Sequence, residues 1–478
     1  MKGEHVTALA VLLLSTALAA PAAAVPERSE IQSAIRALEG DHDQAAAAAH
    51  ILRAGGRSAA EAIFGAWPSL SLLAKKRAIE PLAGLAVTHD SAVEALVVAA
   101  RSDDDTLQTR SLAALQRATP RGRQGLAALL TDANVGDRAA ISLARTDPSF
   151  ALGALLTAIA SEGGADRAGL RQALAVASER GGDTPGALHS WLRDEPGADA
   201  VASAALGLST LDAERAEVAK LVEHAIAHAR SFAARWRLAR SAGPAGPSER
   251  IDSWLDAQRR DREEWMLRDA ALEALAMRGR REQARSSLGD PYPRVRARAA
   301  AVLAGDGATM VERATLARRD AWPMVRAAAV TSLRREGEAA PVVVASVDDS
   351  MSVVRTAAIE ALATAPHEEG WDRIHRRLRD RKEWPSVTAA AIDYAAAHCR
   401  TDAVDALLGV VLRAAPSNAR TEDLNNAARA IEALRILGTP ESRAAVDQLR
   451  RTDDVPPTLK MALQHPLPED GRCASAGR

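Results

Sequence analysis

The sequence has few aromatic residues and almost no cysteine. Phe, Trp and Tyr together make up 3% of its 478 residues, and Cys occurs twice. Sandwiches and barrels of β-strands are rich in aromatic and β-branched residues, so this composition disfavours them. Two cysteines exclude a disulfide-dense scaffold and a cysteine-rich zinc site. The apolar fraction of 47%, in which Ala dominates, favours a folded core of packed helices.

An excess of positive charge is also lacking. Lys and Arg number 61 against 62 Asp and Glu, which gives a formal net charge of −1. Proteins that bind nucleic acid usually show a clear basic excess, so we expect no nucleic-acid partner. Beyond the first 24 residues no run is apolar and long enough to cross a bilayer, which takes about 20 residues.

Residues 1–24 have the pattern of a secretory signal peptide. Lys2 supplies the positive charge, 6–20 form an apolar stretch, and alanines at 22–24 form a small-residue cleavage site. We expect cleavage after Ala24 and export to the periplasm or the medium. The alternative is that this stretch is a buried first helix.

Four segments align without gaps around a valine, at 290–303, 320–333, 349–362 and 382–395. Small or apolar residues recur four and eight positions after each valine, which places them on one helical face. Asp or Pro before the valine is typical of a helix start. Second amphipathic stretches lie between the segments, for example 308–319 and 402–414. The spacing predicts an all-α fold, an α-α superhelix of helix–turn–helix units about 30 residues long.

The motif D-x-x-x-x-V-R-x-x-A, seen in 320–329 and 349–358, resembles HEAT repeats of the short, phycobilisome-lyase-like type. The resemblance covers roughly 260–400 and implies a solenoid in which Arg and Asp of adjacent units make contact. The residues expected to stiffen the stack in this way are Asp290, Val295, Arg296, Asp320, Val325, Arg326, Asp349, Val354 and Arg355.

The repeat signature fades toward the N-terminus, although Ala/Leu helices continue there. Gly and Pro cluster in GPAGPS at 243–248, which predicts a break between two halves. We therefore expect a degenerate helical-repeat half at 25–242, a HEAT-like half at 249–452 and a Pro-rich tail at 453–478.

Motifs of the commonest hydrolases, NTPases and metalloproteases do not occur in the sequence. His224 and His228 stand four residues apart in an expected helix, 214–230, where two imidazoles can share a metal ion. No third ligand is evident, and an exposed helical face is the alternative. We therefore assign no catalytic residue, no cofactor and no metal site.

Two groups of residues are candidates for binding a partner. A basic segment contributes Trp371, Arg373, Arg376, Arg377 and Arg379, whose alternative is a solvated helix face. A column of large side chains precedes the anchor valines, and it either plugs the seam between repeats or offers exposed binding anchors. This column comprises Tyr292, Trp322, Met351 and Trp384.

Cys399 and Cys473 form an even pair in a chain that we expect to be exported. An oxidising compartment favours a disulfide between them, which would pin the tail across the last repeats. The alternative is a small buried Cys399 and a free Cys473.

We therefore expect an exported, non-enzymatic α-solenoid scaffold that binds another protein. Two alternatives remain. One is an enzyme of lyase or oxidoreductase type, which rests on fold resemblance alone. The other is an envelope component that binds polyanionic polymers through its arginines.

Overall fold

The computed structural model describes residues 25–365, 367–414, 419–452, 455–464 and 473. Every regular element in these residues is a helix and none is a strand, so the prediction of an all-α fold is confirmed. The expected signal peptide and most of the expected Pro-rich tail lie outside the described residues. None of the described helices combines the length and the apolar character that a membrane span needs.

The chain divides into two compact units, Met1–Leu211 and Asp212–Arg478. In unit 1, helices pack on their neighbours in sequence and on the next but one, as α2 does on α4 and α4 on α6. Its helices are α1 Arg28–Ala37, α2 His42–Ala54, α3 Gly56–Ala66, α4 Leu72–Leu85, α5 Asp90–Ala100, α6 Asp105–Arg117, α7 Arg121–Ala127, α8 Gly136–Thr146, α9 Pro148–Ala160, α10 Ala168–Glu179, α11 Thr184–Leu192 and α12 Ala198–Leu208, with 3-10 helices η1 Trp67–Ser69 and η2 Gly164–Asp166.

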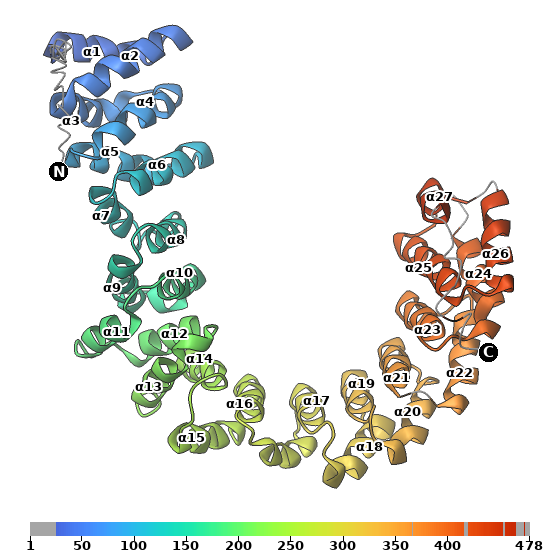
Figure 1. Cartoon of the computed structure of the whole chain (residues 1–478). Coiled ribbons are helices and arrows are strands. Elements are labelled where there is room, and N and C mark those ends of the chain that lie inside the picture. The colour runs from blue at the N-terminus through green and yellow to red at the C-terminus, as the bar shows by residue number, and fades with distance from the viewer. Residues whose placement is uncertain (1–24, 366, 415–418, 453–454, 465–472, 474–478) are drawn as a thin grey trace, which may run out of the picture. The chain divides into compact units, whose positions relative to one another are not determined.

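Unit 2 consists of two layers of helices that follow each other side by side (Figure 1). Layer A contains α14 Phe232–Ala242, α16 Trp265–Met277, α17 Pro293–Val302, α19 Pro323–Ser332, α21 Ser352–Thr364, α23 Pro385–Ala397, α25 Thr421–Leu437 and α27 Pro457–Gln464. Layer B contains α13 Arg215–Ala225, α15 Glu249–Arg259, α18 Met310–Arg319, α20 Ala340–Ser346, α22 Glu368–Arg379, α24 Val404–Arg413 and α26 Pro440–Arg451, with 3-10 helices η3 Asp212–Glu214, η4 Arg281–Gly289, η5 Gly307–Thr309, η6 Gly337–Ala339 and η7 Thr401–Ala403.

The aligned segments of the sequence form α17, α19, α21 and α23 of layer A. Pro occupies the first turn of α17, α19 and α23, where its missing N–H costs no helical hydrogen bond. The anchor valines Val295, Val325, Val354 and Val387 are fully buried. The alanines four residues later are buried too, and their small side chains let neighbouring helices approach closely. The repeat register thus places its apolar face in the core.

The GPAGPS segment at 243–248 is a turn between α14 and α15 inside unit 2, whereas the two units divide at Leu211. The side chain of Arg278, which is 5% exposed, holds this turn through its guanidinium. It donates hydrogen bonds to the carbonyl oxygens of Ala242, Ala245, Gly246 and Ser248 at 3.0 to 3.2 Å. A buried arginine that binds several backbone carbonyls makes this segment an ordered part of the unit.

Candidate protein-binding surface

Four arginine–carboxylate pairs, here called the rungs, join successive helices of layer A. In each rung Nε and Nη2 of the arginine donate to a carboxylate that precedes the next layer-A helix, and no rung side chain is more than 15% exposed. Paired bonds of this kind are the strong geometry for arginine. The rungs are Arg268–Asp290, Arg296–Asp320, Arg326–Asp349 and Arg355–Glu383.

Each rung carboxylate also fixes the start of its own helix. Asp320, for example, accepts a hydrogen bond from the backbone N–H of Trp322 at 2.9 Å, and Asp349 accepts one from Met351 at 2.8 Å. The aspartates therefore lie two residues before the helix N-cap, and the large residues of the column are themselves the N-caps. The same oxygens thus tie neighbouring repeats together and hold the backbone of the column.

The two central rungs, Arg296–Asp320 and Arg326–Asp349, are stabilised in their ionised form. The hydrogen bond to Asp320 raises the pKa of Arg296, although burial opposes the increase. Burial by itself raises the pKa of Asp320, but hydrogen bonds from Arg296 and from the Trp322 N–H outweigh it and leave that pKa below its usual value. The pKa of Asp349 is lowered in the same way, by hydrogen bonds from Arg326 and from the Met351 N–H. Arg296 and Arg326 are therefore bound to carboxylates of the solenoid itself.

The column residues lie largely in solvent. Trp322 is 54% exposed, Met351 45% and Trp384 63%, so these side chains do not plug the seam between repeats. The seam is filled instead by the anchor valines and the rungs. The exposed Met266, Met324 and Val353 and the partly buried Trp265 lie in the first turns of the same row of helices. We define the apolar band as Trp265, Met266, Tyr292, Trp322, Met324, Met351, Val353 and Trp384.

The apolar band follows adjacent helices from α16 to α23. At its first end the rings of Trp265 and Tyr292 stack with centroids 4.2 Å apart, and the Arg294 guanidinium lies 5.6 Å from the Trp265 ring centroid. A row of exposed apolar side chains on adjacent helices, with aromatic and thioether groups among them, is typical of a protein-interaction site.

Most arginines of the basic segment, the first candidate for binding a partner, form ion pairs within unit 2. Arg373, Arg376 and Arg377 of α22 converge on the Asp348 carboxylate, and the Arg377–Asp348 distance is 2.7 Å. Burial raises the pKa of Asp348, but hydrogen bonds from Arg377 and Arg373 outweigh this and lower it. Of the four arginines, only Arg379 makes no ion pair with the described residues. These ion pairs reduce the segment's capacity to attract an acidic partner.

Trp371 has to be removed from that candidate patch, because its side chain lies in the core. It is 4% exposed, its Nε1 donates to Asp402 at 2.6 Å, and its ring stacks on Tyr394 with centroids 5.8 Å apart. Trp371, Ile374 and Leu378 stand at i, i+3 and i+7 and are all buried. That helical spacing is the sequence signal that could have placed Trp371 inside.

Unit 1 contains similar links that the sequence reading missed. Lys76 of α4 pairs with Asp104 at 2.7 Å, and Arg123 of α7 pairs with Asp147 at 2.6 Å. Both aspartates are N-caps, of α6 and α9 respectively. The sequence signal is a cation 24 to 28 residues before a capping aspartate.

The two histidines considered for a metal site do not share a helix. The helix expected at 214–230 ends at Ala225, so His224 is in its last turn and His228 lies in the turn beyond it. In the part of the chain that the structure describes, no three His, Cys, Asp or Glu side chains converge as metal ligands.

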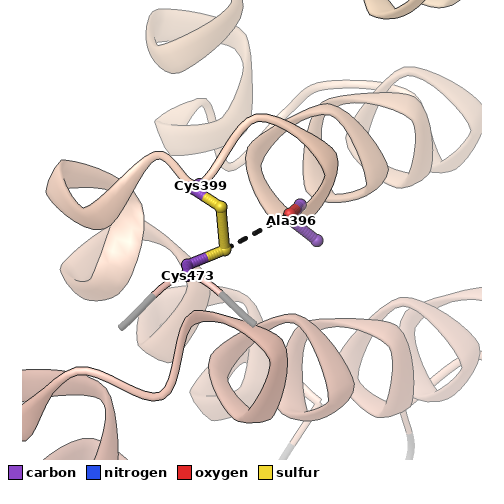
Figure 2. The surroundings of a disulfide bond; sticks show 3 residues. All are labelled: Ala396, Cys399 and Cys473. Carbon is purple, nitrogen blue, oxygen red and sulfur yellow. Dashed lines mark hydrogen bonds between the residues drawn. A yellow bond between two sulfur atoms is a disulfide. The ribbon is translucent and has the colours of Figure 1, made fainter. Parts of the chain in front are cut away.

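Cys399 and Cys473 are joined by a disulfide, with Cα atoms 5.3 Å apart (Figure 2). Cys399 comes directly after the C-cap of α23 and has a φ of +50°. This left-handed conformation is most often adopted by glycine at the end of a helix. Cys473 is buried and its N–H donates to the carbonyl oxygen of Ile436 in α25 at 3.4 Å. The bond therefore ties residue 473 to the packed helices α23 and α25.

No protein-family model matches this chain, and no curated protein sequence matches it either. Among solved structures, it is similar to the karyopherin Kap121p bound to the extreme C-terminus of the protein phosphatase Cdc14p, with a TM-score of 0.50 and 11% identity over 91% of this chain. The fold is a HEAT-like α-solenoid. A second Kap121p structure, bound to Pho4p, has a TM-score of 0.49 and 12% identity over the same share of this chain. The solenoid spans about half of these two karyopherin chains, 52% and 53%.

Proposed function

We propose that this α-solenoid is an exported, non-enzymatic scaffold that binds another protein through the apolar band. We also propose that its repeats belong to the short, phycobilisome-lyase-like type, on the strength of the D-x-x-x-x-V-R-x-x-A motif. The observation that carries the proposal is the exposure of Trp322, Met351 and Trp384 on successive helices. Exposed aromatic and thioether side chains in a row are suited to the apolar anchors of a partner.

The rungs support this proposal because they fix the spacing of those anchors. Arg326, for example, binds Asp349 of the next repeat, and Asp349 in turn holds the backbone N–H of Met351. Anchors on a rigid support lose little conformational entropy when a partner binds. Solenoids of this kind characteristically present extended surfaces to other proteins.

Binding of polyanionic polymers is less well supported. A ladder of free arginines would attract such a polymer, but Arg268, Arg296, Arg326 and Arg355 are each paired with a carboxylate. A polyanion would have to displace those carboxylates from sites that are mostly buried. The apolar side chains of the band carry no charge that would attract a polyanion.

Two observations support export. Residues 1–24 have the charge, the apolar stretch and the small residues of a signal peptide. The Cys399–Cys473 disulfide is a bond that persists in oxidising compartments and is rare where thiols are kept reduced. N-terminal sequencing of the protein from fractionated cells tests this part: we expect a start near Val25 outside the cytoplasm, and soluble cytoplasmic protein with an intact Met1 would contradict it.

Binding is tested by placing a photo-crosslinking amino acid at Trp322, Met351 or Trp384 in the producing cells. We expect all three positions to crosslink to the same polypeptide. The matched controls are Val311 and Met461, which are 69% and 65% exposed but lie outside the apolar band. Equal crosslinking from the controls, or none from the apolar band, would contradict the proposal.

A further inference from the structure

The ladder of rungs ends at α23, and a cavity lies where it ends. The layer-A helices α16, α17, α19 and α21 each carry a rung arginine, but α23 has Thr388 at that position. A cavity of about 330 Å³ borders Thr388, together with Asn426 of α25. A second cavity of about 350 Å³ adjoins it and shares the residues Arg381, Leu412 and Arg413.

Two arginines of this cavity, the exposed Arg381 and the half-buried Arg413, have no carboxylate partner among the described residues. Arg381 and Arg413 line both cavities, and neither makes an ion pair with any described residue. Arg413 only donates a long hydrogen bond, 3.4 Å, to the carbonyl oxygen of Leu378. We call Arg381 and Arg413 the arginine pair. No described carboxylate forms an ion pair with either guanidinium.

The acidic residues that line the first cavity contact other groups. Glu383 is the rung partner of Arg355 and lies 3.5 Å from Arg377, and Asp423 pairs with Arg420 at 3.0 Å. Asp380 accepts a hydrogen bond from the Lys382 N–H. Asp405 borders the second cavity and makes no ion pair among the described residues either. None of these carboxylates lies within ion-pairing distance of the arginine pair.

The charged form of Arg413 is destabilised in the free protein. Burial lowers the pKa of Arg413 and the neighbouring Arg381 guanidinium lowers it further, which outweighs the opposing effect of the Asp423 and Asp380 carboxylates. Arg298 shows the opposite case: its hydrogen bond to Asp269 raises its pKa even though burial opposes this. A desolvated cation next to another cation gains strongly from a bound anion.

The arginine pair lies next to the last anchor of the apolar band. Trp384, the most exposed member of that band, stands between Glu383 and Pro385, and both of these line the first cavity. One extended polypeptide, at about 3.3 Å per residue, can therefore place an apolar side chain on Trp384 and a neighbouring side chain in the cavity.

We propose that the arginine pair binds an Asp or Glu carboxylate of the partner segment whose apolar side chains lie on the band. The partner is thus a protein with an exposed acidic segment that also carries apolar residues. This inference rests on the proposed function and adds the chemistry of the partner. Arginine forks suit a carboxylate geometrically, and the half-buried position of Arg413 strengthens its attraction to an anion.

The test uses a phage-displayed library of random 12-residue peptides, selected against the mature chain from Val25 onward. Selected peptides are synthesised with each acidic residue as Glu or as Gln, and their Kd is measured by fluorescence polarisation. We expect one acidic position whose change to Gln weakens binding about ten- to a hundred-fold, as loss of a charge-assisted hydrogen bond would. Arg413→Gln or Arg381→Gln should weaken the Glu peptide equally and leave the Gln peptide unchanged.

Controls separate this inference from the proposed function. Arg334→Gln removes an exposed arginine that has no ion pair among the described residues, and it should leave Kd unchanged. Trp384→Ser should weaken both peptides. Peptides that need Trp384 but not the acidic residue would overturn the inference and keep the proposed function. Peptides indifferent to Trp384 would overturn both.

Two further outcomes would also overturn the inference. Inorganic phosphate that competes with the peptide through the arginine pair, at concentrations near the peptide's own Kd, would show a small-anion site. A dimer in sedimentation that Trp384→Ser dissociates would show that a second copy of the chain occupies the band. Misfolding is monitored by melting temperature, which should stay level or rise in Arg381→Gln because a repulsion between cations is removed.

Discussion

Removal of one rung carboxylate should destabilise the solenoid far more than loss of an exposed ion pair. The Asp349 carboxylate accepts two hydrogen bonds from Arg326, at 2.8 and 2.9 Å, and one from the Met351 N–H at 2.8 Å. The side chains of Asp349 and Arg326 are 15% and 12% exposed. Asp349→Ala leaves a mostly buried guanidinium without a counter-charge. Such a loss costs about 3–5 kcal/mol, and the partial exposure places our expectation near the lower figure.

A double-mutant cycle measures this effect. The free energy of unfolding is obtained from urea titrations of wild type, Asp349→Ala, Arg326→Ala and the double variant, and hydrogen exchange in α19 and α21 follows the local effect. The matched control is Asp393→Ala, which breaks the ion pair between Asp393 and Arg429 in the same layer, 59% and 54% exposed. We expect the control to cost less than about 1 kcal/mol. Equal losses at the two pairs would refute the view that the rungs hold the stack.

Three further predictions concern stability. The pKa of Asp349 is lowered on folding, so its contribution to the free energy of unfolding is present above the unfolded pKa of about 3.9 and is lost as pH falls through the lower folded pKa. The difference in free energy of unfolding between wild type and Asp349→Asn, measured by urea titration, should therefore stay constant from pH 7 to 5 and narrow only below about pH 4. Val325→Asp, which buries a charge, should cost several kcal/mol in the same titration, whereas Val311→Asp on the surface should cost less than about 0.5 kcal/mol; similar losses would mean that the repeat register is misplaced. Reduction of the Cys399–Cys473 bond, which closes a sequence separation of 74 residues, should cost about 4 kcal/mol, and unchanged unfolding after reduction, checked by thiol titration, would contradict this.

The sequence predicts the fold and the layer-A register because the repeats encode both locally. Apolar residues four and eight positions after Val325 fix a helical face, and Pro323 fixes its start. Each rung arginine in the aligned segments follows its anchor valine by one residue, and Asp320 and Asp349 each precede theirs by five, so a resemblance between repeats suffices to pair Arg326 with Asp349. Periodic features of this kind need no knowledge of distant packing.

Other features depend on how helices pack, and the sequence alone does not reveal them. Trp371 and Trp384 stand in similarly charged surroundings, yet one is 4% exposed and the other 63%, because Trp371 stacks on Tyr394 and donates a hydrogen bond to Asp402 whereas Trp384 is the N-cap of α23. Thr388 shows in the sequence that the ladder stops. The cavity beside it, and the unpaired charge of Arg413, follow only from the positions of α22, α24 and α25.

The central claim is that the apolar band is covered by a partner in the living cell. Hydroxyl-radical footprinting measures it directly, by comparing the oxidation of Trp322 and Trp384 in cells with their oxidation in the purified protein. Met461, which is 65% exposed outside the band, serves as the internal standard. We predict that both tryptophans oxidise readily after purification and are protected several-fold in cells, relative to Met461. Equal oxidation of the tryptophans in the two samples would contradict the account.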